Sequence, residues 1–410
     1  MKDKHIKICV IGAGSPYTPE IIERLAQMQE ALPVTEISLM DIDETRLDIM
    51  HGFCSRYAAG LGFKVKITKT IDRKQAIIGS AFVLTQIRVG GNAARVKDER
   101  IPMSMGLVGQ ETTGAGGFAK ALRTIPVMLD IAKDVQELAP NAWIINYTNP
   151  TGLITEALTG KVKIAGLCAG GLFPRNWTAE ALGINPKDVY YNFAGLNHMN
   201  FAYDITINGR PITGKEFSAA ADKFDSVDKE LILKLGALPS PYLQYYFHKG
   251  KKLLKSEKTR GEEVMILEKE IFHDFSTSSS KPESLKKRGG GGYSEVACDI
   301  MDAIFNNRDA WAVVNAPNKG ILPFLPNDAV IEVPCIVNAS GITPIAQNSP
   351  PKAVWGLISA VKNYEMLTVE AATTGCNDTA LLALVAHPLI GDYDLAVPLL
   401  EKILEVLNGN

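Results

Sequence analysis

Short apolar runs alternate with helical patterns through the first half of the chain. The runs are rich in β-branched residues, as buried strands are, and the stretches between them carry apolar residues at helical spacing, for example through Ile21, Ile22, Leu25 and Met28. The predicted strands span residues 6–11, 36–40, 64–68, 81–87, 142–147 and 163–168. Strands separated by helices indicate a parallel, doubly wound α/β sheet.

The second half has a less regular pattern. Residues 204–213 predict a β-hairpin that turns at Asn208 and Gly209, and helical patterns dominate from residue 230 onward, most clearly over 240–246, 261–272 and 354–407. Residues 276–292 contain a serine run, three consecutive basic residues and four consecutive glycines, which predict a mobile loop. We place the boundary near Gly166. Residues 1–166 are then a Rossmann-like domain, and residues 167–410 a mixed α+β domain.

Composition is that of an ordinary globular protein. The chain has 410 residues, of which 46% are hydrophobic and 21% charged, with a net charge of −2. From this balance we expect no binding to nucleic acid or to an anionic membrane, and from the residue pattern neither a signal peptide nor a membrane-spanning segment. The six cysteines form no CxxC pair, so we expect a cytoplasmic protein with reduced thiols.

The turn after the first predicted strand resembles a dinucleotide-binding loop. Gly12 and Gly14 match the first two glycines of that fingerprint, whereas Tyr17 replaces the third. An acidic residue follows the second strand, where it can accept hydrogen bonds from ribose hydroxyls and favour NAD over NADP. Asp41 and Asp43 both fit. We assign Asp41 to the ribose and Asp43 to the N-cap of the next helix.

Polar loops follow three more of the predicted strands, where open α/β sheets bind ligands. The loop 88–95 is glycine-rich and contains Arg88 and Arg95, whose guanidinium groups suit anions. A second loop spans 109–118. The third, 146–152, contains Asn149, which can bind sugar hydroxyls or simply stabilise a turn before proline. We assign Ser15 and Arg88, with Gly12, Gly14 and Asp41, to cofactor binding.

Cys168 and His198 close two apolar runs beyond the predicted cofactor domain. Taken alone, each is best interpreted as a buried core residue. Their shared position at strand ends beside a nicotinamide site favours a divalent transition metal instead. Two protein ligands suit a catalytic metal, whose remaining positions substrate hydroxyls and water would fill.

Five motifs, in order along the chain, resemble glycoside hydrolase family 4. They are Val-Ile-Gly-Ala-Gly-Ser-Pro-Tyr-Thr-Pro-Glu, Gly-Gln-Glu-Thr-Thr-Gly-Ala-Gly-Gly-Phe, Asn-Tyr-Thr-Asn-Pro-Thr-Gly, Gly-Leu-Cys and Gly-Leu-Asn-His. The resemblance covers essentially the whole chain and is greatest to the 6-phospho-β-glucosidases. It implies a fold related to lactate and malate dehydrogenases, NAD as a cofactor and a divalent metal, usually manganese.

The resemblance also implies roles for individual residues. Cys168 and His198 correspond to the metal ligands, and Tyr242, in Pro-Tyr-Leu-Gln-Tyr-Tyr, to the catalytic base. The substrate contacts correspond to Arg95, Asn149 and Arg260. The expected reaction cleaves a small phosphorylated disaccharide or aryl glycoside by oxidation at C3, deprotonation at C2, elimination, addition of water and reduction. We expect a homodimer or homotetramer.

The chain departs from the family at one position. Members often carry Asp or Asn directly after the metal-binding cysteine, and the Asp acts as an acid in α-specific enzymes, whereas this chain has Ala169. The departure favours β-linked substrates and leaves the acid unassigned. Two alternatives stay open: an NAD-dependent dehydrogenase of a hydroxy acid or sugar acid, and an inactive sensor of NAD and phosphosugar.

Overall fold

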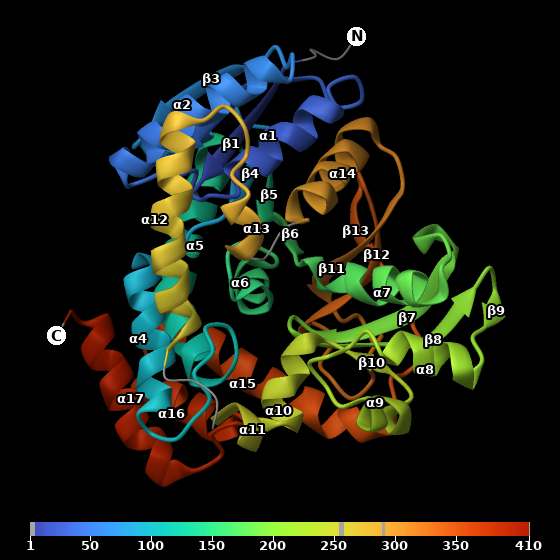
Figure 1. Ribbon diagram of the computed structural model, residues 1–410. Coiled ribbons are helices and arrows are strands. Elements are labelled where there is room, and N and C mark those ends of the chain that lie inside the picture. Colours follow the sequence, from blue (N-terminus) through green and yellow to red (C-terminus); the bar gives the residue numbers. More distant parts are fainter. Residues whose placement is uncertain (1–4, 254–257, 289–291, 410) are drawn as a thin grey trace.

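A computed structural model describes residues 5–253, 258–288 and 292–409. Its backbone is one continuous 13-stranded sheet covered by helices (Figure 1). Six parallel strands in the order β6-β5-β4-β1-β2-β3 form the first part, and they are β1 Ile6–Ile11, β2 Val34–Met40, β3 Lys66–Thr70, β4 Phe82–Thr85, β5 Trp143–Asn146 and β6 Lys163–Leu167. This is the strand order of dinucleotide-binding α/β folds, so the predicted doubly wound sheet is confirmed.

Helices cover both faces of the parallel part because successive residues of its strands point to opposite sides. In β1, Ile8 and Val10 pack into one core with α1 and α2, whereas Cys9 and Ile11 pack into a second core with α3, α5 and α6. The helices of this half are α1 Thr18–Gln27, α2 Glu44–Gly60, α3 Arg73–Ile77, α4 Gly91–Met103, α5 Gly114–Leu138 and α6 Thr151–Leu158.

An antiparallel part extends the sheet beyond β6 in the order β11-β12-β7-β8-β10. Its strands are β7 Val189–Leu196, β8 Met199–Ile207, β10 Leu238–Pro239, β11 Ala310–Pro317 and β12 Val330–Asn338, with β9 Arg210–Pro211 and β13 Gly341–Pro344 beside them. The predicted hairpin at Asn208 and Gly209 is confirmed, because β8 and β9 pair across that turn. Gly166, where we divided the chain, lies inside β6, and the division stays a prediction.

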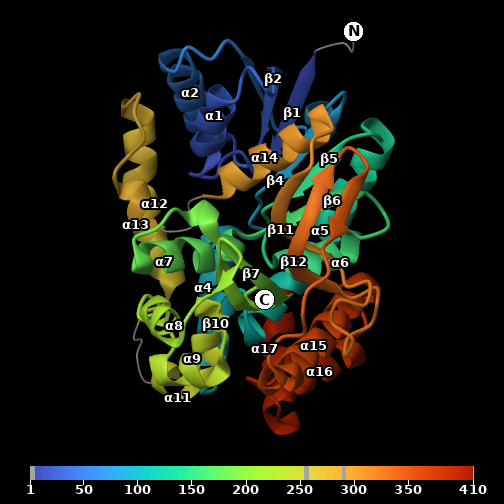
Figure 2. The same cartoon turned by 90° about the vertical axis from the view of Figure 1, so that its right-hand side faces the viewer.

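The second half adds further helices, the last three of which lie together at the bottom of the view in Figure 2. The helices of the second half are α7 Phe173–Leu182, α8 Gly214–Ala221, α9 Lys229–Leu235, α10 Gln244–Phe247, α11 Lys249–Leu253, α12 Arg260–Thr277, α13 Ser284–Arg288, α14 Tyr293–Asn306, α15 Trp355–Thr374, α16 Asn377–Ala386 and α17 Tyr393–Leu407. Helix α12 runs beside α2 and α4, so it ties the second half to the nucleotide-binding half (Figure 1).

Two local predictions were wrong. The stretch 276–292 is not a loop throughout, because Ser284–Arg288 form helix α13 and Leu285 is buried; part of the four-glycine run lies outside the described residues. Arg95 does not lie in a glycine-rich loop, because α4 begins at Gly91 and carries it on a buried face. Within the described ranges, we find no helix of the length and hydropathy needed to span a membrane.

Candidate active site

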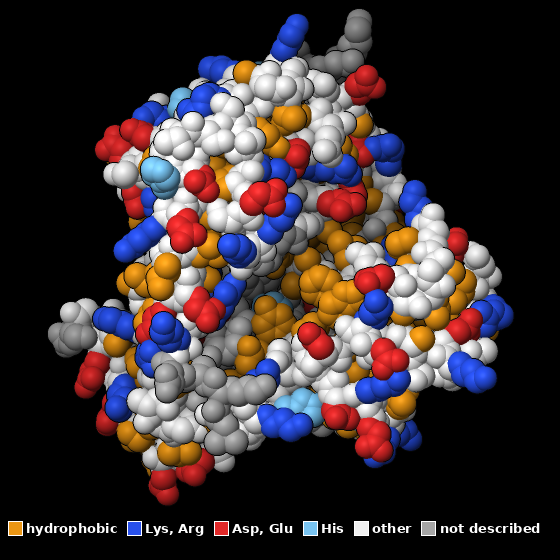
Figure 3. Space-filling model, viewed as in Figure 1, with side chains coloured by type: hydrophobic (Ala, Val, Ile, Leu, Met, Phe, Trp, Pro, Cys, Tyr) orange, Lys and Arg blue, Asp and Glu red, His pale blue; other side chains and the backbone are white. Residues whose placement is uncertain are grey.

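The carboxyl ends of β1, β2, β4 and β5 open into a cavity of about 980 Å³, lined also by residues of α12 and of the segment before α10. This is the place where doubly wound sheets bind nucleotides. Figure 3 shows the face hollowed there, with charged side chains around the opening. Most of the predicted site residues line the cavity, namely Gly12, Gly14, Ser15, Asp41, Arg88, Arg95, Asn149, Tyr242 and Arg260.

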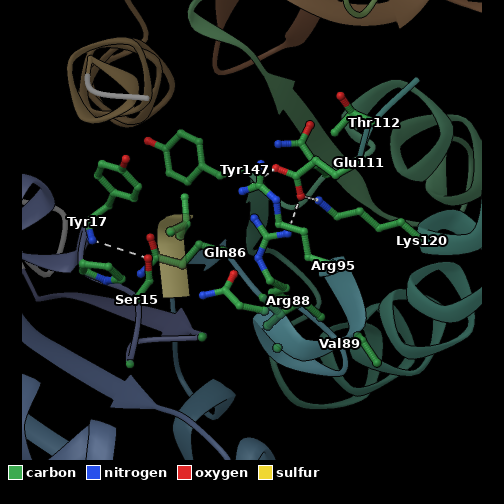
Figure 4. Close-up of a pocket in the computed structure, with 18 of the residues that line it drawn as sticks. Ser15, Tyr17, Gln86, Arg88, Val89, Arg95, Glu111, Thr112, Lys120 and Tyr147 are labelled. Atoms are coloured by element: carbon green, nitrogen blue, oxygen red, sulfur yellow. Dashed lines mark hydrogen bonds and ion pairs between the residues drawn. The ribbon is translucent and has the colours of Figure 1, made fainter. Parts of the chain in front are cut away.

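The glycine loop between β1 and α1 allows close approach of backbone segments. Gly12 has φ +88°, and a Cβ there would lie 2.8 Å from the carbonyl oxygen of Gln86. Side chains at this position are therefore excluded both by backbone strain and by contact. Ser15 follows at the cavity wall, where its Oγ accepts a hydrogen bond from the backbone N–H of Tyr17 at 3.4 Å (Figure 4).

The two candidate aspartates after β2 have different positions. Asp43 caps α2, since its Oδ1 accepts the backbone N–H of Arg46 at 3.0 Å; its predicted role as an N-cap is confirmed. Asp41 accepts the backbone N–H of Gly14 at 2.8 Å and of Asp43 at 3.0 Å. Asp41 thus joins the glycine loop to the end of β2 at the cavity wall, where the ribose contact is expected.

A cluster of charges lies on the opposite wall. Glu111 forms ion pairs with Arg88, with Arg95 at 3.1 Å and with Lys120 at 2.8 Å (Figure 4). Burial alone would raise the pKa of Glu111, but the charges of Lys120, Arg88 and Arg95 outweigh it and hold that pKa well below its usual range. Burial and the charge of Arg88 lower the pKa of Lys120 to about 8. The cluster therefore presents several charged N–H donors to the cavity.

Cys168 and His198 are not among the residues that line this cavity, and His198 adjoins it through its contact with Tyr242. Cys168 follows β6 and caps a short 3-10 helix, with its Sγ accepting the backbone N–H of Gly170 at 3.4 Å. His198 occupies the tight turn between β7 and β8 with φ 65°. Both residues are less than a tenth exposed. Burial raises the pKa of the Cys168 thiol to about 12 and lowers the pKa of the His198 imidazole to about 3.

Tyr242 completes this group from a third segment. It lies in the 3-10 helix Pro241–Leu243, and its ring stacks on the imidazole of His198 with centroids 3.9 Å apart and an angle of 12° between the planes. Burial raises the pKa of its phenol, and the nearby Cys168 raises it further. The fold thus brings together three predicted residues that are separated in sequence by 30 or more positions.

The donor set fits a catalytic metal but not a closed structural one. Within the described ranges, no group of three or more His, Cys, Asp or Glu side chains is placed to hold a metal ion. A neutral imidazole is already in the form that ligates, and the thiol needs to lose one proton. Cys168 and His198 could therefore supply two ligands of the soft and borderline kind that transition metals accept, with the other positions left open.

The remaining predicted substrate contacts lie at the cavity wall. Asn149 follows β5, and its Oδ1 accepts a weak hydrogen bond from Thr151 Oγ1 at 3.4 Å. Arg260 begins α12, pairs with Glu263 at 2.7 Å and donates to two backbone carbonyls of the α13 segment. No hydrogen bond joins the amide N–H groups of Asn149 to another described residue, so these donors can serve a ligand.

Comparison with known families decides the assignment. Residues 7–183 match the family described as family 4 glycosyl hydrolase, and residues 193–390 match the C-terminal domain of the same family. The chain belongs to glycosyl hydrolase family 4. Among its relatives are a probable 6-phospho-beta-glucosidase of Bacillus subtilis, 39% identical over 98% of this chain and 96% of the relative, and the 6-phospho-beta-glucosidase of Escherichia coli, 38% identical over 97% and 95%.

Solved structures of this family share the whole architecture. The 6-phospho-beta glucosidase of Thermotoga maritima, solved with NAD and glucose-6-phosphate, has a TM-score of 0.92 at 35% identity and covers 98% of both chains. A further form of that enzyme contains manganese, NAD+ and glucose-6-phosphate and has a TM-score of 0.91. A malate dehydrogenase of Cryptosporidium parvum, with a TM-score of 0.58 and 15% identity, shares the fold, as the sequence predicted.

One residue of this family 4 site escaped the sequence analysis. Glu332, on β12, is fully buried and accepts hydrogen bonds from Asn197 Nδ2 at 3.2 Å and from Asn200 Nδ2. Asn197 also lies near the Cys168 thiol, whose pKa it lowers. The available signal was a single glutamate in an otherwise apolar strand, because a buried carboxylate needs specific partners. Glu332 thus stands directly behind the proposed metal ligands and orients their neighbours.

Proposed function

We propose that this chain hydrolyses 6-phospho-β-glucosides to glucose 6-phosphate and an aglycone, with NAD and a divalent metal, Mn²⁺, as cofactors. The stacking of Tyr242 on His198 beside Cys168, at the end of a cavity that begins at a dinucleotide loop, is the observation that carries the proposal. The relatives described above, and the ligands of the Thermotoga structures, support it.

The cofactors supply chemistry that no side chain here can provide. When bound, NAD takes a hydride from C3 of the sugar and later returns it, while the metal stabilises the negative charge that develops after the adjacent C2 proton is removed. Cys168 and His198 would hold the metal. Gly12, Gly14, Ser15, Asp41 and Arg88 would hold the dinucleotide along the ends of β1, β2 and β4.

Tyr242 is the proposed base at C2. Its phenol oxygen would take the C2 proton, and the electron pair left on carbon then expels the aglycone oxygen from C1. With its pKa raised, the phenol stays protonated at neutral pH and cannot take up the C2 proton, so the positive charges nearby must favour the phenolate. Arg95 lies close enough to act on Tyr242 electrostatically, and a metal held by the stacked His198 would act in the same direction.

The charged wall is suited to a phosphorylated substrate. Arg88, Arg95 and Lys120 carry three positive charges against the carboxylates of Glu99 and Glu111. An excess of guanidinium and ammonium donors in a partly enclosed cavity attracts a dianionic phosphate. Arg95 and Arg260 are the proposed contacts to the phosphate or to groups near the metal, and Asn149 the proposed contact to sugar hydroxyls.

Ala169 favours β-linked substrates. It is buried directly beside Cys168, and it offers no carboxylate to protonate a leaving group. The α-specific mechanism implied by the family resemblance would need an acid at that position.

The location in the cytoplasm and the homodimeric or homotetrameric state stay predictions.

The test is an assay of α- and β-linked chromogenic 6-phosphoglycosides with NAD, Mn²⁺ and a thiol reductant. We expect turnover of the β-6-phosphoglucoside only, without net formation of NADH. Activity that survives removal of both NAD and metal contradicts the mechanism. Net NADH formation indicates a dehydrogenase instead, and thermal stabilisation by the ligands without turnover indicates a sensor.

A further inference from the structure

Glu268 is a buried carboxylate on α12 that binds residues from three other helices. Its oxygens accept hydrogen bonds from Arg46 Nη1 at 3.1 Å, from Arg288 Nε and Nη2 at 3.0 and 2.7 Å, and from Asn92 Nδ2 at 2.9 Å. Burial would raise the pKa of Glu268, but Arg288 and Arg46 lower it, so the side chain is a carboxylate at neutral pH. It lines the cavity near the glycine loop.

Arg46 connects this carboxylate to the glycine loop. It lies in the first turn of α2, and its Nε donates to the carbonyl oxygen of Gly14 at 3.1 Å. A Cβ placed on Gly14 would lie 3.0 Å from the Arg46 Cβ and 2.8 Å from Asp41 Oδ2. The Arg46 side chain and the Asp41 carboxylate therefore flank the same glycine. Phe272 of α12 supports the guanidinium, which lies 4.2 Å from the ring centre.

These neighbours give opposite signals about the cofactor. An acidic residue after the second strand accepts the ribose 2′-hydroxyl of NAD, whereas an arginine nearby accommodates the 2′-phosphate of NADP. Asp41 provides the first signal and Arg46 the second. The side chain of Arg46 is 35% exposed, which leaves it accessible from the cavity unless another group holds it. Glu268 is the group that holds it.

We propose that Glu268 is a specificity-determining residue. It holds the Arg46 side chain against α12 and so makes the site select NAD over NADP. The inference rests on the proposed position of NAD at the glycine loop. Two guanidinium groups, those of Arg46 and Arg288, pair with the one carboxylate of Glu268. Replacing Glu268 with a neutral amide removes the charge that holds Arg46 and releases its guanidinium toward a 2′-phosphate.

The experiment measures the dissociation constants of NADH and NADPH with the full-length chain by nucleotide fluorescence, without metal or sugar. We expect Glu268→Gln to lower the ratio of the NADPH constant to the NADH constant by about tenfold or more. Glu270→Gln is the matched control, because Glu270 is an exposed glutamate of the same helix, and it should leave the ratio unchanged. An unchanged ratio in a folded Glu268→Gln protein overturns the proposal.

Substitution of Arg46 provides a second test, in which any effect of Glu268→Gln on the packing of α12 is common to the variants compared. In the Glu268→Gln background, Arg46→Gln should restore the original ratio, since the released cation is gone. Arg46→Gln alone should leave the ratio within about twofold of the original, because Glu268 already withholds that cation. A larger loss of NADPH affinity in the single variant shows that Arg46 is available despite Glu268, and contradicts the proposal.

Asp41→Asn separates the inference from the placement of the cofactor. If NAD binds at the glycine loop, this variant weakens NADH binding. If Asp41→Asn and Glu268→Gln both leave NADH and NADPH binding unchanged, the proposed position of NAD is wrong. If only Glu268→Gln is without effect, the position holds and the role of Glu268 fails.

Discussion

The two ends of the cavity are built in contrasting ways. At the nucleotide end, Gly12, Gly14 and Asp41 come from two consecutive strand ends, and backbone geometry does most of the positioning. At the other end, Cys168, His198 and Tyr242 come from three segments far apart in sequence, and a fully buried glutamate supports them from behind. The first end depends on local chain conformation, and the second depends on tertiary packing.

The two ends of the cavity also differ in whether their side chains are charged or neutral. Asp41 and Glu268 are carboxylates that accept hydrogen bonds from N–H donors, so the nucleotide end is charged before any ligand binds. Burial keeps the Cys168 thiol, the His198 imidazole and the Tyr242 phenol neutral. A buried neutral triad becomes reactive only when a cation offsets the cost of desolvating negative charge. We therefore expect catalysis here to require the metal, and dinucleotide binding to proceed without it.

Removing the Tyr242 hydroxyl should separate the two ends most strongly. We expect Tyr242→Phe to lower kcat by about 10²–10⁴-fold, the usual contribution of a positioned acid or base. The dissociation constant of NADH should stay the same, because the nucleotide end does not contact this ring. Tyr190→Phe, which removes a hydroxyl from an exposed tyrosine, is the control. Equal losses of kcat and NADH affinity would mean that the two ends are not independent.

Glu332→Gln tests the support behind the proposed metal ligands. The amide preserves the shape but cannot accept both hydrogen bonds from Asn197 and Asn200, so we expect Mn²⁺ affinity to fall by about 10–100-fold, as for other outer-shell partners. Electron paramagnetic resonance of free Mn²⁺ measures this without turnover. Glu283→Gln, at an exposed surface position, is the control. If the Mn²⁺ affinity is unaltered, Glu332 contributes to folding and not to metal binding.

Metal binding should become tighter as pH rises. The Cys168 thiol, with its pKa raised to about 12, is protonated at neutral pH and must release a proton on binding Mn²⁺. Affinity is therefore expected to increase by about tenfold per pH unit across pH 6–8, apart from any change in other groups. Cys168→Ser should lose both the affinity and this slope. A flat profile in the original chain would exclude the thiol as a ligand, while NADH binding serves as the internal control.

The two aspartates after β2 should give the smallest effects. Asp43→Ala removes the cap of α2 and should cost about 1 kcal/mol of stability, measured by denaturant unfolding, without changing NADH affinity. Asp41→Asn should weaken NADH binding instead, because it removes the charge beside Gly14. The reverse pattern would exchange the assigned roles of Asp41 and Asp43.

Prediction from the sequence succeeded where local signals were strong. The strands before the glycine loop and before Asn149 were located to within a few residues, because buried parallel strands are continuous apolar runs. The antiparallel strands β11 and β12 were not predicted individually. Helix α13 was also missed, since its run of basic residues is typical of a loop, whereas in the structure Arg288 pairs with Glu268 and Leu285 packs into the core.

The sequence by itself determined the parallel nucleotide-binding sheet, the glycine loop, the acidic residue after the second strand and the family. Each of these depends on residues that are close together along the chain. Tertiary structure alone decided that Tyr242 stacks on His198, that Glu332 stands behind Cys168, and that Glu268 holds Arg46. The physical reason is distance along the chain. Local conformation follows from neighbouring residues, whereas these contacts join segments whose approach depends on packing of the whole sheet and its helices.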